Sequence, residues 1–275
     1  MAQGPSAPRC LVFDSGIGGM GVVQALRDLR PDLHIDYLAD TALFPYGEQP
    51  DGPLTERIVT LLDAATRRLQ PDIVVIACNT ASTIALPRLR ERLTVPVVGC
   101  VPPIRWAGRV STSRVIGLLS TSATARRPYI QDLHRSFAPD CRLITHGARG
   151  LADLAERAFL EEPLEEADIL RELDCLFSQP DGGKIDTIGL GCTHYTFLMP
   201  DFSRLAPAGL TWLDPAPAVA RQVDSVLRTC PTHNHPIRPV RLLMTRLPDG
   251  PARLQRAVQR LGFSLIESFD LQPSL

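Results

Sequence analysis

The feature that most constrains the fold is an alternation of short apolar, β-branched runs with stretches of helical pattern. The apolar runs lie at 9–13, 34–39, 72–77, 96–99, 114–120, 141–146, 186–191, 210–214 and 240–245. The stretches of helical pattern lie at 19–29, 82–93, 151–159 and 165–177. Apolar runs that alternate with helices in this way predict parallel strands joined by crossover connections. We therefore expect an α/β fold.

A proline-containing segment divides this alternation into two series. The segment 100–108 (CVPPIRWAG) follows the run at 96–99, and its paired prolines interrupt regular structure. We expect a first domain formed by residues 1–99 together with 213–275, and a second domain formed by residues 100–212. The chain has 275 residues, which is long enough for two domains that each bury a core.

Charge and hydropathy exclude several classes of partner. The chain has 29 Lys+Arg against 30 Asp+Glu, and the basic residues are scattered, so we expect neither a nucleic-acid partner nor a membrane. No apolar stretch approaches the roughly 20 residues that span a bilayer. The first residues, MAQGPSAPRC, lack the apolar core of a signal peptide, and we expect a cytoplasmic protein. The 7 cysteines include no C-x-x-C pair, which predicts reduced thiols.

Two stretches of the sequence share one construction. Residues 74–82 (VVIACNTAS) and 188–196 (IGLGCTHYT) each contain an apolar run, a small residue, a cysteine and two polar side chains. In α/β sheets, ligands bind at the carboxyl ends of the strands. We expect both stretches to meet there with residues 14–16 (DSG) and 39–47 (ADTALFPYG). We also expect the residues after each cysteine to open a helix. The N–H groups at the N-termini of these helices would then stabilise thiolates and carboxylates.

A pair of thiols is suited to acid/base chemistry on opposite faces of a carbon centre. One thiolate removes a proton while the other thiol supplies one from the opposite side, which inverts a stereocentre. An ordinary thiol pKa of about 8.5 lets both forms be reached near neutrality. A Cys-His-Asp hydrolase would explain one cysteine and leave its twin idle. A lone cysteine that closes a buried strand is usually a packing residue, but the repeated context favours function for Cys78 and Cys192.

A glycine motif offers another interpretation. Gly16, Gly18 and Gly21 satisfy the G-x-G-x-x-G pattern, and Asp40 lies near the offset of a ribose-binding acid, as in an NAD-dependent Rossmann enzyme. The carboxylate of Asp14 weighs against it, because it would repel the pyrophosphate. The glycines could equally form a tight turn and nothing more. A ligand-binding or sensory module ranks third, since binding alone gives no reason for two reactive thiols.

Four motifs, DSGIGG, DTALFPYG, ACNTAS and GCTHY, resemble in order and spacing the cofactor-independent aspartate/glutamate racemase family. The resemblance reaches from residue 14 to residue 195. It implies two pseudosymmetric parallel-sheet α/β domains with the active site in the cleft between them, no metal or organic cofactor, and a homodimer. The implied reaction is a two-base interconversion of L- and D-glutamate, which supplies D-glutamate for bacterial peptidoglycan and thus for the cell wall and cell shape. Aspartate racemases and related hydantoin racemases share the thiol pair and remain alternatives.

The resemblance also implies roles for individual residues. Cys78 and Cys192 match the two catalytic thiols, and Asp14, His194 and Glu156 match further catalytic groups. The residues that match substrate-binding positions are Asp14, Ser15, Tyr46, Gly47, Asn79, Thr80, Thr121, Thr124, Thr193 and His194.

Simpler interpretations stand beside these roles. Asp14 could cap the following helix, and Tyr46 could be packed in a turn. Thr121 and Thr124 could be helix N-cap residues. His194 alone could be a hydrogen-bonded core histidine, although its neighbour Cys192 favours function.

Two segments depart from the family pattern. Thr196 stands where the family commonly has proline, and residues 145–156 (THGARGLADLAE) replace a usual Cys-Pro-containing stretch. Near the end of the chain, Cys230, His233 and His235 lack both the standard zinc spacing and a fourth ligand, so we expect a surface loop and no metal there.

Overall fold

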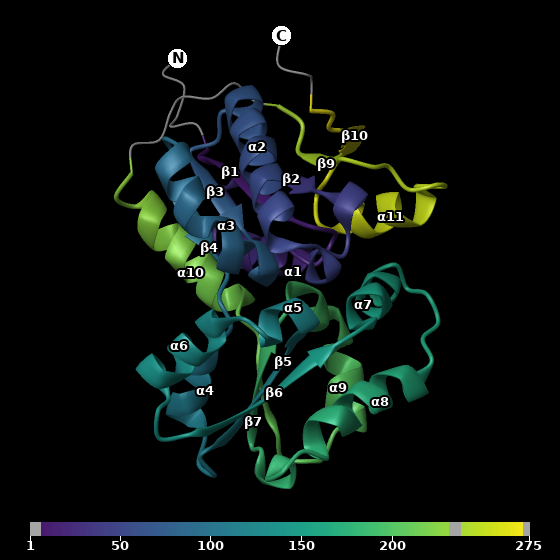
Figure 1. Ribbon diagram of the computed structural model, residues 1–275. Coiled ribbons are helices and arrows are strands. Elements are labelled where there is room, and N and C mark those ends of the chain that lie inside the picture. Colours follow the sequence, from purple (N-terminus) through teal and green to yellow (C-terminus); the bar gives the residue numbers. More distant parts are fainter. Residues whose placement is uncertain (1–6, 231–237, 272–275) are drawn as a thin grey trace. The chain divides into compact units, whose positions relative to one another are not determined.

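The apolar runs of the sequence form the strands of two parallel sheets (Figure 1). The structure, a computed structural model, describes residues 7–230 and 238–271. Within these ranges every strand pair is parallel, and helices connect successive strands. The predicted α/β class is confirmed.

The chain divides into two compact units. Unit 1 comprises Met1–Cys100 and Ala216–Leu275, and unit 2 comprises Val101–Pro215. The strands of unit 1 are β1 (Arg9–Asp14), β2 (His34–Ala39), β3 (Ile73–Ile76), β4 (Val97–Gly99), β9 (Arg241–Met244) and β10 (Leu265–Ser268). The strands of unit 2 are β5 (Val115–Thr121), β6 (Arg142–Ala148), β7 (Thr187–Gly191) and β8 (Thr211–Leu213). The sheet of unit 1 has the order β10-β9-β2-β1-β3-β4, and the sheet of unit 2 has the order β6-β5-β7-β8.

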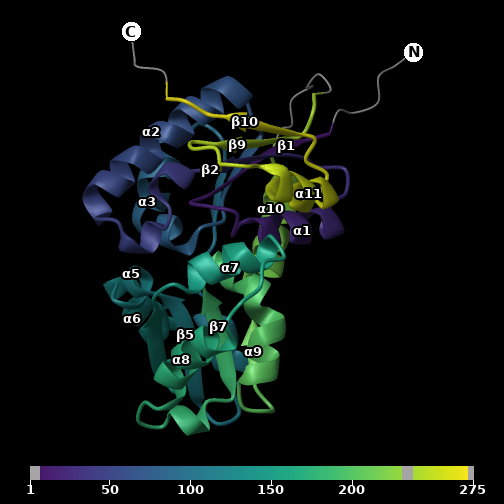
Figure 2. The same cartoon turned by 90° about the vertical axis from the view of Figure 1, so that its right-hand side faces the viewer.

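Helices cover both faces of the sheet of unit 1. They are α1 (Met20–Leu29), α2 (Asp51–Leu69), α3 (Asn79–Arg92), α10 (Ala216–Leu227) and α11 (Ala252–Arg260), with the 3-10 helices η1 (Thr41–Leu43) and η2 (Tyr46–Glu48). Figure 2 shows α2 and α3 on one face, with α1, α10 and α11 on the other. The steps from β1 to β2 and from β2 to β3 run in opposite directions along the sheet, so right-handed crossovers place α1 and α2 on opposite faces.

Helix α2 was not predicted from the sequence, although its pattern is helical. Its buried residues are Leu54, Thr55, Ile58, Leu61, Leu62, Ala65 and Leu69, which recur at the spacing of one helix face. All of these except Thr55 belong to one apolar core with Leu11 and Phe13 of β1, and each fully buried Leu or Ile contributes about 1.5–3 kcal/mol. The helix ends where Gln70 adopts the left-handed conformation (φ 51°). Its first residues, Asp51–Gly52–Pro53, resemble a turn, which explains why the pattern was overlooked.

In unit 2, alternate residues of β5 face two separate cores. The helices of this unit are α4 (Ile104–Val110), α5 (Ser122–Ala125), α6 (Pro128–Phe137), α7 (Leu151–Phe159), α8 (Glu166–Phe177) and α9 (Met199–Leu205), with η3 (Gly182–Lys184) and η4 (Thr193–Leu198). Ile116 and Leu118 belong to the core that contains residues of α4 and α6. Val115 and Leu119 belong to the core that contains residues of α7, α8 and α9. Figure 1 shows α4 and α6 on one side of this sheet and α8 and α9 on the other.

The proline-containing segment 100–108 is only partly irregular. Helix α4 begins at Ile104 immediately after Pro103, so the second half of the segment is helical. Proline is tolerated at the start of a helix because the N–H that it lacks would have no intrahelical partner there. None of the helices in the described ranges combines the length and the apolarity needed to cross a lipid bilayer.

The two sheets share one strand order. In each of them the chain places its second strand beside the first and then returns to the other side of the first strand with the third: β2-β1-β3-β4 in unit 1 and β6-β5-β7-β8 in unit 2. The order therefore reverses between β1 and β3 and again between β5 and β7. In open α/β sheets, ligands bind at the carboxyl ends of the strands beside such a reversal.

Candidate active site

Cys78 lies at the reversal point of unit 1. It follows the end of β3, and the preceding Ala77 donates its backbone N–H to the carbonyl of Phe13 on β1 at 2.9 Å. Cys78 is the N-cap residue of α3, and its sulfur accepts the backbone N–H of Ala81 at 3.5 Å. The thiol is 6% exposed. The sulfur is thus held at the N-terminus of a helix, where the peptide dipoles stabilise negative charge.

Asn79, the first residue of α3, carries a buried polar side chain without a partner. It is 2% exposed, and neither its amide oxygen nor its amide nitrogen has a hydrogen-bond partner within the described part of the chain. A buried polar group left in this state costs about 1–3 kcal/mol, so such groups in native proteins call for a specific explanation. A small ligand with both donor and acceptor groups, held at the N-terminus of α3, would satisfy both atoms.

Asp14 ends β1 and is fully buried. One of its oxygens accepts the backbone N–H of Gly16 at 3.2 Å and the hydroxyl of Ser15 at 3.3 Å. The simpler interpretation of Asp14 as a helix cap is wrong, because α1 begins at Met20 with Gly19 as its N-cap residue. The carboxylate therefore shapes the loop at the end of β1.

The glycine-rich loop after Asp14 is held by close packing. Tyr37 of β2 donates its hydroxyl to the carbonyl of Gly16 at 2.9 Å. A Cβ atom at Gly19 would lie 2.7 Å from that hydroxyl and 2.8 Å from the Cβ atom of Ala77, so only glycine fits. The small residue before Cys78 and the glycine of this loop thus allow β1, β3 and α1 to approach closely.

Tyr46 lies in η2, after the loop that follows β2, and is 1% exposed. Its hydroxyl donates to the carboxylate of Asp40 at 2.7 Å, and its ring belongs to the same core cluster as Cys78. Burial, the negative charge of Asp40 and the hydrogen bond to it raise the pKa of Tyr46 well above its ordinary value. Tyr46 therefore remains a neutral hydrogen-bond donor. Gly47 is the second residue of η2.

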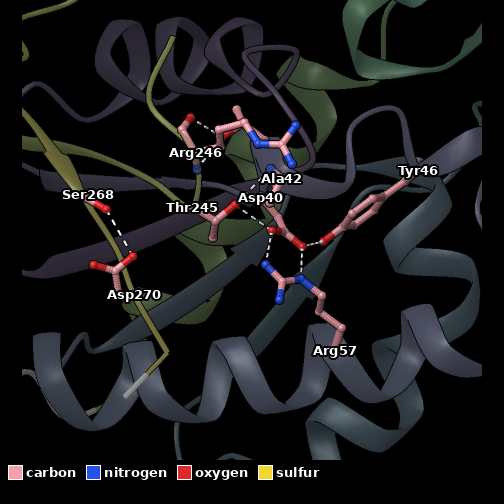
Figure 3. A network of polar contacts seen from close by, with 9 residues as sticks. Asp40, Ala42, Tyr46, Arg57, Thr245, Arg246, Ser268 and Asp270 are labelled. Carbon is pink, nitrogen blue, oxygen red and sulfur yellow. Dashed lines mark hydrogen bonds and ion pairs between the residues drawn. The ribbon is translucent and has the colours of Figure 1, made fainter. Parts of the chain in front are cut away.

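Asp40, the candidate ribose-binding acid, is committed to other partners. Figure 3 shows Arg57, Thr245 and Tyr46 converging on its carboxylate. Burial raises the pKa of Asp40, but these hydrogen bonds and the charge of Arg57 outweigh it and hold the pKa below its ordinary value. Both oxygens are occupied by donors from the protein itself, which leaves the carboxylate unsuited to a ribose hydroxyl.

Cys192 lies at the reversal point of unit 2. It follows Gly191, the last residue of β7, and is 7% exposed. A Cβ atom at Gly191 would lie 2.7 Å from the Cβ atom of Ser120 on β5, so a small residue is again required before the cysteine. A helix follows Cys192 as expected, but it is the 3-10 helix η4 and not an α-helix, and no side chain caps it.

His194 connects Cys192 to Glu156. The imidazole Nδ1 lies 3.9 Å from the sulfur of Cys192, and Nε2 lies 3.2 Å from a carboxylate oxygen of Glu156 on α7. His194 is 3% exposed, and the Glu156 side chain is 26% exposed. A carboxylate that fixes an imidazole beside a thiol is the arrangement by which proteins orient and charge a proton-transferring group.

Tyr195, next to His194, was not assigned a role from the sequence. It is fully buried and donates its hydroxyl to the carbonyl of Ser120 at 3.2 Å. Burial and the nearby charges of Cys192 and Glu172 raise its pKa well above its ordinary value. Each cysteine thus lies within electrostatic range of one buried, neutral tyrosine.

Thr121 and Thr124 form a hydroxyl pair at the end of β5. Thr121 is the N-cap residue of α5, accepts the backbone N–H of Thr124 at 3.3 Å and has its hydroxyl 3.0 Å from that of Thr124. The capping interpretation is confirmed for Thr121, and the role in holding a carboxylate stays a prediction. Thr80 in α3 and Thr193 in η4 are both buried. Thr80 lies two residues after Cys78, and Thr193 lies directly after Cys192.

The structure collects the candidate residues in two groups, one at the carboxyl edge of each sheet. In unit 1 the group consists of Asp14, Ser15, Tyr46, Gly47, Cys78, Asn79 and Thr80. In unit 2 it consists of Thr121, Thr124, Glu156, Cys192, Thr193 and His194. Arg57 was missed with the helix that carries it, and the apolar spacing of that helix was the available signal.

The departures from the family pattern have local partners. The hydroxyl of Thr196 donates to Asp214, and His146, within the stretch 145–156, lies 2.6 Å from Glu172 on α8. His233 and His235 lie outside the described residues. Within residues 7–230 and 238–271, no group of three His, Cys, Asp or Glu side chains is placed to hold a metal ion.

Comparisons with known proteins place this arrangement in a family. The sequence profile described as Asp/Glu/Hydantoin racemase matches residues 21–223. Glutamate racemase of Granulibacter bethesdensis is 49% identical over 219 residues, which cover 80% of this chain and 78% of that relative. Glutamate racemase of Pectobacterium atrosepticum is 40% identical over 272 residues, which cover 97% and 93%. The crystal structure of Escherichia coli glutamate racemase in complex with L-glutamate and the activator UDP-MurNAc-ala has a TM-score of 0.91 at 34% identity, covering 97% of this chain and 100% of that chain.

Fold and candidate site together define an α/β isomerase built from two parallel-sheet units, each with a cysteine at its reversal point. The chain belongs to the Asp/Glu/hydantoin racemase family. The resemblance inferred from the four motifs is therefore confirmed, and the NAD-dependent alternative is excluded.

Proposed function

We propose that the enzyme interconverts L- and D-glutamate without a cofactor, with Cys78 and Cys192 as two bases that act on opposite faces of one substrate. The identities of 49% and 40% to glutamate racemases over most of the chain support glutamate over aspartate. The chemistry supports the absence of a cofactor, because two thiols can carry out both proton transfers themselves.

The reaction consists of two proton transfers. From D-glutamate, the Cys78 thiolate removes the α-proton and leaves an electron pair on the α-carbon, delocalised into the carboxylate. The Cys192 thiol then donates its proton to the opposite face, which yields L-glutamate, a Cys78 thiol and a Cys192 thiolate. The reverse reaction uses the same groups in exchanged roles. The family resemblance assigns Cys78 to the D enantiomer and Cys192 to the L enantiomer.

The surroundings of each thiol support this chemistry in a different way. An N–H group of α3 points at the sulfur of Cys78 and stabilises its thiolate. Beside Cys192, the imidazole of His194 is held by Glu156 close to the sulfur, where it can pass a proton to or from the thiol. Asp14 is proposed to bind the substrate ammonium or to assist a thiol, and Glu156 to act through His194.

The carboxylates of the substrate need neutral donors, since charge builds up on one of them during the reaction. Asn79 offers an amide without a partner within the described residues. The other proposed substrate contacts are Ser15, Tyr46, Gly47, Thr80, Thr121, Thr124, Thr193 and His194. The serine and threonine hydroxyls among them are neutral groups that can stabilise this negative charge, whereas the hydroxyl of Tyr46 is already donated to Asp40.

One observation carries the proposal: two sheets of the same strand order each present a buried cysteine at the point where that order reverses. A binding module or a single-nucleophile hydrolase has no use for the second cysteine. An enzyme that moves a proton from one face of a carbon to the other needs both.

The test is exchange of the α-hydrogen in deuterated water. The purified enzyme, dialysed against a chelator and assayed without added cofactor, should incorporate deuterium at the α-carbon of glutamate while the optical rotation decays to zero. Parallel incubation with aspartate decides the substrate. Activity that appears only after addition of zinc or pyridoxal phosphate, or exchange of aspartate alone, contradicts the proposal.

We further propose that the enzyme is cytoplasmic, works as a homodimer and supplies D-glutamate for peptidoglycan, as the family resemblance implies. Sedimentation equilibrium at assay concentration measures the assembly directly. A mass near 30.1 kDa, the mass of one chain, would contradict the dimer. Rescue of a bacterial strain that requires D-glutamate for growth tests the biosynthetic role.

A further inference from the structure

The carboxylate of Asp40 is the centre of the polar network in Figure 3. Arg57 of α2 donates to both oxygens, at 2.6 and 2.8 Å, and Thr245, at the end of β9, donates to one of them at 2.7 Å. The hydroxyl of Tyr46 donates to the other oxygen at 2.7 Å. Asp40 is fully buried. A buried carboxylate with four hydrogen bonds from three elements is fixed in position, and it also fixes the side chains that donate to it.

A second buried aspartate–arginine pair, which links β2 to β9, shows what is special about Asp40. Asp36 of β2 accepts two hydrogen bonds from the guanidinium of Arg241 on β9, at 3.2 and 2.8 Å. This pair lies nearer to the amino ends of these strands, and it holds no residue of the candidate site. Asp40 differs in that one of its donors, Tyr46, is packed in the core cluster that contains Cys78.

We propose that Asp40 is a positioning residue for the Cys78 half of the active site, acting through the hydroxyl of Tyr46. This inference rests on the proposed function, since it concerns the proton transfer at Cys78. Asp40 does not touch the substrate. It sets the position of the Tyr46 ring, which in turn sets the position of the Cys78 sulfur.

The physical reason is that the hydroxyl of Tyr46 is tied to Asp40 while its ring packs in the core cluster that contains Phe13 and Cys78. Its ring centroid lies 6.3 Å from that of Phe13 in a tilted arrangement, and the hydrogen bond to Asp40 adds a directional contact that such apolar packing lacks. Proton transfer from carbon requires the base within a few tenths of an ångström of its place, and a displacement of about 1 Å costs about 100-fold in rate. Arg57 keeps Asp40 ionised and compensated, so the anchor persists while the thiolate forms nearby.

The test uses three variants, each of which changes only the polar end of one side chain. Tyr46→Phe removes only the anchored oxygen, and Asp40→Asn removes the charge. Asp36→Asn is the matched control, because Asp36 is a buried aspartate of β2 that is also paired with an arginine. Because the two enantiomers are equally stable in water, any variant must lower kcat/KM equally for both, so the directional readout is the primary isotope effect with α-deuterated substrate.

Slower proton transfer at Cys78 changes the two isotope effects in opposite directions. The effect from D-glutamate increases, because the C–D bond of that enantiomer breaks at Cys78 in the slow step. The effect from L-glutamate decreases, because its C–D bond breaks earlier, at Cys192. We expect Tyr46→Phe and Asp40→Asn to show this pattern with a loss of about 10- to 100-fold in kcat/KM. Asp36→Asn should keep both isotope effects even where it lowers the melting temperature.

A second readout needs no substrate. Alkylation of Cys78 by iodoacetamide, followed by peptide mass spectrometry with Cys192 as internal reference, should accelerate several-fold in Tyr46→Phe and Asp40→Asn but not in Asp36→Asn. If alkylation accelerates in Tyr46→Phe and Asp40→Asn as expected while the wild type exchanges no α-hydrogen, the proposed function is refuted and the positioning of the Cys78 sulfur is still supported. Isotope effects and alkylation in Tyr46→Phe and Asp40→Asn that match those of Asp36→Asn would overturn the positioning role.

Discussion

Replacing Glu156 by glutamine isolates what the carboxylate does for Cys192. The substitution keeps the shape of the side chain and one possible hydrogen bond to His194, and it removes the negative charge. In the wild type the carboxylate lies 3.2 Å from Nε2 of His194, whose Nδ1 lies 3.9 Å from the sulfur of Cys192. The change therefore reaches the thiol through the imidazole.

The expected magnitude follows from the burial of the two partners. A hydrogen bond to a charged group contributes about 1.5–3 kcal/mol, and the lower part of that range applies because the Glu156 side chain is 26% exposed. About 1.5–2 kcal/mol corresponds to a loss of about 10- to 30-fold in kcat/KM. His194 itself is 3% exposed, so little water can replace the lost charge.

The assay combines kcat/KM with isotope effects in both directions. Slower proton transfer at Cys192 should increase the primary isotope effect from α-deuterated L-glutamate and decrease that from D-glutamate, the reverse of the pattern expected for Tyr46→Phe. Glu166→Gln is the matched control, since Glu166 pairs with Arg204 on an exposed surface where ion pairs contribute little. Wild-type isotope effects in Glu156→Gln, or a loss no greater than in the control, would refute the role of Glu156.

Three further predictions concern the thiols, Asp14 and the stability of unit 2. Each of Cys78→Ala and Cys192→Ala should abolish interconversion, because either direction of the proposed reaction uses both thiols. Racemisation near the wild-type rate in either variant, measured by polarimetry, would exclude the two-base mechanism. Asp14→Asn should lower turnover by about 10-fold or more, since the carboxylate is buried beside the reversal point, while the circular dichroism spectrum stays unchanged. Isothermal titration should show no NAD binding to either form. Asp186→Asn should destabilise unit 2 by about 1–3 kcal/mol at pH 7, because its carboxylate accepts the backbone N–H groups of Thr112 and Ser113 at 2.7 and 2.6 Å. Burial raises the pKa of Asp186, but these hydrogen bonds hold it well below its ordinary value, so the stabilisation is complete above the unfolded pKa of about 3.9 and is lost as the pH falls below it. Urea unfolding followed by tryptophan fluorescence measures this, since both tryptophans, Trp106 and Trp212, lie in unit 2; equal stability of variant and wild type at pH 7 would contradict it.

The strands β1 to β9 were predictable because each is a short run with its own local signal. The run 34–39 became β2 residue for residue, and the pattern at 151–159 became α7 residue for residue. Buried parallel strands are apolar on both faces, so they are visible in the sequence without knowledge of their neighbours. The helix α11 and the strand β10 were not predicted, since β10 is half exposed and only its pairing with β9 defines it.

The networks around the site could not be predicted, because they join residues that are distant in sequence. Asp40 and Thr245 are 205 positions apart and meet only because β9 pairs with β2. The G-x-G-x-x-G pattern suggested a ribose-binding role for Asp40, whereas the pairing of strands commits it to Arg57 and Thr245. Local pattern reveals which side chains end a strand, and the strand order decides what those side chains contact.

The two proposed catalytic thiols are stabilised by different groups. A thiol that must take a proton from carbon needs its thiolate stabilised, and inversion requires such a thiol on each face of the substrate. Cys78 has the N-terminus of a 14-residue α-helix, whose aligned peptide dipoles supply the stabilisation. Cys192 precedes only a 6-residue 3-10 helix, and there the sequence supplies His194 and Glu156 instead. The helix dipole acts without any side chain, whereas the Cys192 side depends on an imidazole that can exchange a proton with the thiol. His194→Asn should therefore slow proton transfer at Cys192 and leave that at Cys78 unchanged. At one fixed pH, the primary isotope effect from α-deuterated L-glutamate should increase and that from D-glutamate should decrease relative to the wild type; equal changes in both would show that the two thiols are stabilised alike.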